Sequence, residues 1–146
     1  MDKIEKFDKY LQDTEAVLLF DKTIENDIAY YKSCYENKFG EFTYIVIIYP
    51  TPVVEVLSNV IKVVGDKARE IVLTNINELN RKTKGIKYFL DERGNVGLTH
   101  EFIGPVEEFD PEKVVGTAVA LFRHAERDLA QLIIELQKEK NKNENQ

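Results

Sequence analysis

The chain has 146 residues, of which 43% are hydrophobic and 32% are charged. This balance is typical of a globular domain with a buried core and excludes the composition of a disordered chain, which is less hydrophobic and more highly charged. The net charge is −6, with 26 acidic residues against 20 basic ones, which argues against a surface built to bind nucleic-acid phosphates. Because Cys34 is the single cysteine, neither an intramolecular disulfide nor a multi-cysteine zinc site can form, and a reducing compartment is favoured.

The two ends of the sequence are strongly polar. The N-terminal segment MDKIEKFDKYLQDT is charged throughout and lacks the apolar stretch of a signal peptide. No apolar run approaches the roughly 20 residues needed to span a bilayer. We therefore expect a soluble, cytoplasmic protein that does not bind membranes, folded as a single domain over residues 1–146. Residues 138–146 contain no apolar side chain and are expected to fray.

The first elements in chain order are a helix and an ambiguous apolar run. Ile4, Phe7 and Leu11 recur at helical spacing in a charged background, which predicts an amphipathic helix over about residues 3–13. Residues 16–20 form an apolar run too short to classify by its period, and we interpret it as extended. Residues 21–27 are polar and typical of a turn.

Two strands joined by a hairpin loop are predicted next, over residues 28–36 and 41–49, because Gly40 can supply the positive φ of such a loop. The second strand is apolar on both faces, which is typical of a strand in the middle of a sheet. One face carries Phe42, Tyr44, Val46 and Ile48, and the other carries Ile45, Ile47 and Tyr49. Two prolines then force a corner before residues 53–64, whose β-branched side chains predict a third antiparallel strand.

A second helix is predicted from Asp66, a suitable N-cap, to Gly85, whose freedom to adopt a left-handed conformation suits a helix end. The hydrophobic period then changes at once from 3.6 to 2. This change predicts a hairpin of residues 86–90 and 96–102 around an acidic, glycine-containing turn.

The last predicted element is a long helix, for which Asp110 and Pro111 are suited to the N-cap and the first position. An apolar stripe then continues over about 30 residues at helical spacing. The element order is α-β-β-β-α-β-β-α, which predicts an α+β fold: an antiparallel sheet of about five strands with helices packed mainly on one face. We expect a homodimer, because a large uncovered apolar face is uncommon on a monomer.

Residues 72–98, VLTNINELNRKTKGIKYFLDERGNVGL, place a helix ending in Asn77-Glu78-Leu79-Asn80 before an aromatic strand, an acidic turn and a second strand. In this the chain resembles the YbjN-like bacterial family, and the resemblance covers about residues 42–136. It implies the fold of the class I type III secretion chaperones, with the same element order. It also implies a binding or adaptor role, in a dimer that holds a partner's segment in extended form, and it brings no catalytic residues with it.

The residue types that carry catalysis or bind cofactors are scattered along the sequence. The glycines are isolated, so phosphate-binding glycine motifs are lacking, and no G-x-S-x-G nucleophile motif occurs. His100 and His124 could join Glu101 in a metal site, but their spacing does not support one, and we interpret His124 as paired with Asp128 on a solvated face. Cys34 has no activating neighbour in the sequence, so we interpret it as a buried or half-buried structural thiol. We expect no catalytic residue, no cofactor and no metal.

A group of five tyrosines and one isoleucine most strongly suggests a function. Tyrosine offers a flat ring and a hydroxyl, which suits a surface that binds a protein, although cross-strand tyrosine pairs also simply stabilise sheets. The candidate partner-binding residues are Tyr30, Tyr31, Tyr35, Tyr44, Ile47 and Tyr49. The favoured hypothesis is a non-enzymatic, chaperone-like or adaptor protein that binds a protein partner. The alternative is a small enzyme or ligand-binding domain whose pocket is not visible in the sequence.

Overall fold

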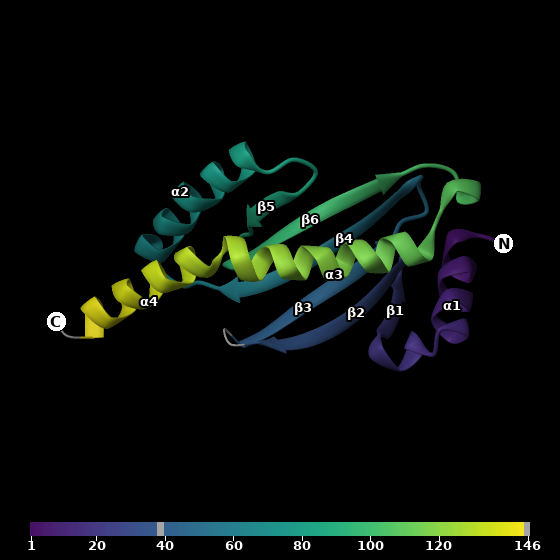
Figure 1. Ribbon diagram of the computed structural model, residues 1–146, viewed down its shortest axis with the longest axis horizontal. Helices are drawn as coiled ribbons and strands as arrows, with labels where there is room; N and C mark the ends of the chain where they lie inside the picture. Colours follow the sequence, from purple (N-terminus) through teal and green to yellow (C-terminus); the bar gives the residue numbers. More distant parts are fainter. Residues whose placement is uncertain (38–39, 145–146) are drawn as a thin grey trace.

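The computed structural model describes residues 1–37 and 40–144 (Figure 1). A six-stranded sheet with the strand order β1-β2-β3-β4-β6-β5 forms the centre, and every pair of neighbouring strands is antiparallel. The strands are β1 (Asp21–Glu25), β2 (Ile28–Asn37), β3 (Gly40–Ile48), β4 (Val53–Lys62), β5 (Lys87–Leu90) and β6 (Asn95–Ile103). The helices are α1 (Lys3–Asp13), α2 (Asp66–Lys82), α3 (Pro111–Asp128) and α4 (Ala130–Glu144), with short 3₁₀ helices η1 (Ala16–Leu19) and η2 (Val106–Glu108).

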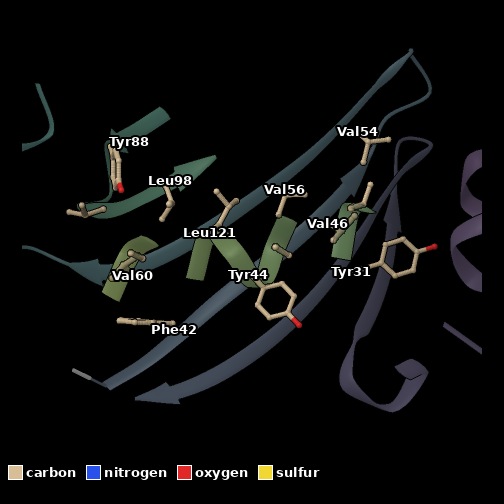
Figure 2. Packing of buried hydrophobic residues seen from close by; sticks show 14 of the residues in the cluster. Tyr31, Phe42, Tyr44, Val46, Val54, Val56, Val60, Tyr88, Leu98 and Leu121 are labelled. Atoms are coloured by element: carbon tan, nitrogen blue, oxygen red, sulfur yellow. The ribbon is translucent and has the colours of Figure 1, made fainter. Parts of the chain in front are cut away.

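The core lies between the sheet and helix α3, which crosses the sheet diagonally (Figure 1). Figure 2 shows Val46, Val54, Val56 and Leu98 directed from three strands toward this helix, where Leu121 meets them. Their alternation with outward-facing residues is the two-residue period of a strand with one buried face. The predicted α+β fold, with helices packed mainly on one face of an antiparallel sheet, is therefore confirmed.

The region between the first helix and β2 differs from the prediction. Of residues 16–20, predicted as extended, Ala16–Leu19 form η1 instead, and the side chains of Val17, Leu18 and Leu19 are exposed. Phe20 has the extended backbone that was predicted, and its ring is buried. Residues 21–27, predicted as a turn, contain β1 and a tight turn in which Asn26 and Asp27 both have positive φ. All five side chains of β1 are exposed, so the strand lacks the apolar alternation that would predict it. The sheet consequently has six strands rather than five.

Helices α1 and α2 begin and end close to where the sequence predicts. The Asp2 side chain accepts from the backbone N–H of Glu5, whose own side chain accepts from Asp2 in return, a capping box that fixes the start of α1. Gly65, rather than Asp66, is the N-cap of α2. Helix α2 ends at Lys82, before Gly85, whose φ of +79° nevertheless confirms the expected left-handed conformation.

The predicted C-terminal helix is divided by a bend. Asp110 caps α3 and Pro111 occupies its first position, as expected. At the fully buried Leu129 the chain leaves regular helical geometry and continues as α4, which packs against α2. Helix α4 extends to Glu144 and so includes most of the segment that is expected to fray, while residues 145–146 lie outside the described part. Lys38 and Phe39 of the predicted hairpin loop also lie outside it.

The edge of the sheet at β5 is closed by a side chain of α2. The Asn80 side chain accepts a hydrogen bond from the Tyr88 backbone N–H at 2.7 Å and donates one to the Tyr88 carbonyl oxygen at 3.1 Å. Asn80 thus makes the two bonds that a neighbouring strand would make. The last asparagine of the Asn77-Glu78-Leu79-Asn80 segment therefore has a structural role, because it joins α2 to the outer strand.

A second polar contact joins β5 to α3. The Tyr88 hydroxyl donates to Asp128 Oδ2 at 2.7 Å, and Arg127 Nε donates to Asp128 Oδ1 at 3.2 Å. Partial burial alone would raise the pKa of Asp128, but the hydrogen bonds from Tyr88 and Arg127 outweigh it and lower that pKa. The ionised carboxylate therefore stabilises the fold at neutral pH, and this stabilisation is lost as the pH falls through the folded-state pKa.

We predict that Tyr88→Phe lowers the free energy of unfolding by about 2 kcal/mol at neutral pH, because a hydrogen bond to a charged group is lost. The deficit should shrink as the pH falls and Asp128 becomes protonated. Urea unfolding across that range measures both effects. In the background of Asp128→Asn, Tyr88→Phe should cost much less, and an equal cost in both backgrounds would contradict the assignment.

Candidate functional site: the uncovered face of the sheet

The sheet has one face on which, within residues 1–37 and 40–144, no helix packs (Figure 1). The strand registers define the centre of this face. Ile47 of β3 lies between Tyr30 of β2 and Glu55 of β4, and the next row toward the hairpin loop places Ile45 beside Leu57. We call this set of five residues the outer face. Its apolar centre is flanked by polar and charged side chains.

The six candidate residues from the sequence divide between the two faces. Tyr30, Ile47 and Tyr49 lie on the uncovered side, whereas Tyr31, Tyr35 and Tyr44 lie on the helix side. Adjacent residues of a strand face opposite ways, so Tyr30 and Tyr31 cannot share a surface. The sequence itself shows this separation, because two residues of one strand that are an odd number of positions apart face opposite sides of the sheet. Tyr44 and Tyr49 are five positions apart and lie on different faces.

The three tyrosines on the helix side form part of the packed interior. Tyr31 is 1% exposed and its hydroxyl donates to Asp8 Oδ1 of α1 at 2.7 Å. Burial, together with that hydrogen bond, raises the pKa of Tyr31. Tyr44 is 3% exposed, and Tyr35 stacks on it with ring centroids 5.0 Å apart. These rings hold β2, β3 and α1 together rather than facing a partner.

Ile47 is 6% exposed, because its neighbours on the uncovered side screen it, while Ile45 and Leu57 are half-buried. A second copy or a partner could remove the remaining exposed area of Ile45 and Leu57 from water, at about 25 cal/mol for each Å² of apolar surface. The outer face therefore favours binding of another surface more than binding of a small molecule, for which it has no enclosed cavity.

Two carboxylates lie opposite one another beside this apolar centre. Glu55 of β4 pairs in register with Glu101 of β6. Burial raises the pKa of Glu55, and the neighbouring charge of Glu101 raises it further. Burial also raises the pKa of Tyr49, as do the charges of Glu55 and Glu101. Like charges directly opposite on two strands destabilise a sheet, so this pair is a local cost to the fold.

We predict that Glu55→Gln stabilises the protein at neutral pH by about 0.5 kcal/mol, because the repulsion from Glu101 is removed. The folded-state pKa of Glu55 lies above its unfolded value. The wild type therefore loses stability as the pH rises through the folded-state pKa, and the gain from Glu55→Gln should vanish at acid pH. Thermal unfolding of the variant against wild type measures this. Glu25→Gln, on the exposed edge strand, is the control and should change little; a gain from Glu55→Gln that persists in acid would refute the account.

The histidines and the cysteine do not form a catalytic group. His100 Nδ1 contacts the carbonyl oxygen of Gly85, and His124 lies 3.7 Å from Asp128, the partner expected from the sequence. Cys34 is exposed on β2, which corrects the expectation that it is buried. Among residues 1–37 and 40–144, no three His, Cys, Asp or Glu side chains are grouped closely enough to hold a metal ion. In the same residues no helix is both long and apolar enough to cross a membrane.

Comparison with known proteins supports the fold. A chain in the crystal structure of the ExsC-ExsE complex is similar, with a TM-score of 0.50 and 14% sequence identity, covering 86% of this chain and 92% of that chain. The shared fold is the type III secretion chaperone fold, as predicted. At this identity the likeness concerns the fold alone. No protein-family model and no curated protein matches the chain, so the resemblance to the YbjN-like family rests on the sequence segments quoted above.

Proposed function

We propose that this chain is a non-enzymatic, chaperone-like or adaptor protein that binds another protein. We further propose that it is related to the YbjN-like family and that it works as a homodimer. The observation that carries the proposal is the outer face, a half-buried apolar surface at the centre of a sheet whose helices lie on the other side. The similar fold in the ExsC-ExsE complex, an assembly of two proteins, supports a protein as the partner.

The rival reading, a small enzyme or ligand-binding domain, would need polar groups that converge on a cavity. A cavity of about 690 Å³ lies between α1, the β1–β2 turn and the β3–β4 turn, lined largely by apolar residues such as Ile24 and Val106. Lys3 is its one basic residue, and its ammonium group already donates to the carbonyl oxygens of Pro52 and Gly104, each at 2.8 Å. The Lys3 ammonium group therefore stabilises the fold and is not directed at a ligand. This favours a protein-binding function over an enzymatic one.

A second copy is the simplest cover for the outer face, because soluble homo-oligomers are mostly two-fold dimers with self-complementary surfaces. Ile45 and Leu57 lie next to each other in register at its centre. A two-fold axis through this pair would bring the same two side chains from both copies together. Tyr44, on the opposite side of β3, takes no part in such a contact.

We predict that Ile45→Asp weakens self-association without unfolding the chain. Ile45 is half-buried and lies beside Lys32 in register, which can compensate the new carboxylate within a monomer. In the dimer the same carboxylate would be desolvated against an apolar surface, at a cost of about 2 kcal/mol or more. Ile47 is less suited to this test, since a charge there would be buried in the monomer as well.

Light scattering over a dilution series measures the effect. Ile24→Asp is the matched control, because Ile24 is 57% exposed on the other side of the sheet and should leave association unchanged. A monomer mass for the unmodified protein at high concentration would remove the homodimer from the proposal. Circular dichroism of both variants establishes that they remain folded.

A further inference from the structure

Strand β6 extends beyond its outer neighbour and leaves an open edge. Strand β5 pairs with β6 only as far as Thr99, whereas β6 continues to Ile103 with β4 on its other side. Figure 1 shows β6 continuing past β5 with no strand of the described chain along its outer side. Such an edge offers unpaired backbone groups to an added strand.

The hydrogen bonds of Tyr88 identify which backbone groups face this open side. In an antiparallel ladder, alternate residues direct both their N–H and C=O groups to the same neighbour. Tyr88 directs both groups to Asn80, away from β6, so Lys87 pairs through its backbone with Thr99. Two and four residues further along β6, Glu101 and Ile103 therefore direct their backbone groups to the side where β5 has ended. Ile103 is also 74% exposed.

This open edge contrasts with the edge formed by β5. There, Asn80 already binds the outward-facing groups of Tyr88, so an added strand would have to displace it. No residue of the described chain makes the equivalent backbone contacts with Glu101 or Ile103. At this end of the sheet, an added strand can therefore pair with the free backbone groups of β6 but not with those of β5.

A groove with basic residues lies alongside the open edge, between β6 and α3. It has a volume of about 480 Å³ and continues into a cavity of about 570 Å³ that shares Gly85, Ile86 and His100 with it. The ionisable residues that line the groove are Lys84, His100, Lys113 and His124, with no carboxylate among them. The adjoining cavity includes Glu101, and a cavity of about 320 Å³ beside Glu101 and Ile103 includes Glu108 and Asp110 together with Lys113. The positive charge is therefore confined to the part of the edge beside His100. The floor on α3 includes Gly116, where a side-chain carbon would meet no atom within 4 Å, so a bound segment could approach the helix closely.

The alternation of side chains connects the edge to the groove. His100 and Phe102 face the helix side of the sheet, whereas Glu101 faces the opposite side. A strand added along β6 would direct every second side chain toward the groove, beside His100 and the two lysines. Acidic side chains at those positions would meet positive charge. A polypeptide fits the site better than a free anion does, because only a backbone can bind the outward groups of Glu101 and Ile103.

We propose that an extended, acidic segment of a partner protein docks along the outer edge of β6, with alternate carboxylates facing Lys84 and Lys113 in the groove. This inference rests on the proposed function as a protein-binding chain and adds the chemistry of the partner. It concerns a surface separate from the outer face, so the two can be tested independently.

The test uses two short synthetic peptides, one with glutamate and one with lysine, each alternating with valine. Each peptide is titrated into the full chain, with fluorescence anisotropy for the dissociation constant and amide NMR shifts for the location. The glutamate peptide should bind and should shift the amide signals of Glu101 and Ile103 together with those of α3 that line the groove. The lysine peptide should bind far more weakly.

Two kinds of variant separate the roles of charge and edge. The double change Lys84→Glu and Lys113→Glu should weaken binding of the glutamate peptide by roughly tenfold or more. Lys142→Glu, near the distant end of α4, is the matched control and should change it less than about twofold. Ile103→Pro removes one outward N–H without touching the ladder to β4 and should also weaken binding, whereas Ile103→Thr keeps the N–H and should not.

Several results would overturn the proposal: no binding of the glutamate peptide to the unmodified chain, equal binding of the lysine peptide, an equal effect of Lys142→Glu, or amide shifts confined to β1 or the outer face. Shifts that grow with protein concentration in the absence of peptide would assign the edge to a second copy instead. Shifts confined to the outer face would place the peptide on the surface of the proposed function. The other outcomes do not bear on Ile45 and the outer face, so the proposed function would stand or fall separately.

Discussion

Helix α3 lies diagonally across β3, β4 and β6, and its buried residues form the upper layer of the core. They are Val114, Ala118, Leu121 and Ala125. The two alanines let the helix approach the sheet closely, while Leu121 fills the space beside Val56 and Leu98 (Figure 2). The helices of the described chain all pack on this one face of the sheet, and the other face is left uncovered. The outer face follows from that arrangement.

Elements with a strong hydrophobic period were predictable from the sequence. Phe7 and Leu11 fix α1, and the change of period after Gly85 fixes the hairpin of β5 and β6. Strand β1 was not predictable, since an edge strand exposed on every side chain is held by backbone bonds to β2 and leaves no pattern. The bend at Leu129 was also hidden, because the apolar stripe continues through it and only packing against α2 redirects the chain.

The candidate site was predictable only in part, for a related reason. The sequence shows that β3 is apolar on both faces, but which face the helices cover is decided by tertiary packing. This is why Tyr31 and Tyr44 became core while Tyr30 and Tyr49 remained on the uncovered side. The open edge of β6 depends on the relative lengths of paired strands, and its closed counterpart on the reach of one side chain, Asn80. Neither property has a local sequence signal.

Hydroxyl-radical footprinting of the tyrosines, read by mass spectrometry over a concentration series, tests the central claim most directly. Tyr30, Tyr31, Tyr44 and Tyr49 serve as internal standards for one another. Tyr31 and Tyr44 should resist labelling at every concentration, whereas Tyr30 and Tyr49 should be labelled in dilute protein and become protected as the protein is concentrated. Equal labelling of Tyr30 and Tyr49 throughout the series, or labelling of Tyr31 and Tyr44 to the same extent, would contradict a one-sided sheet whose uncovered face is an interface.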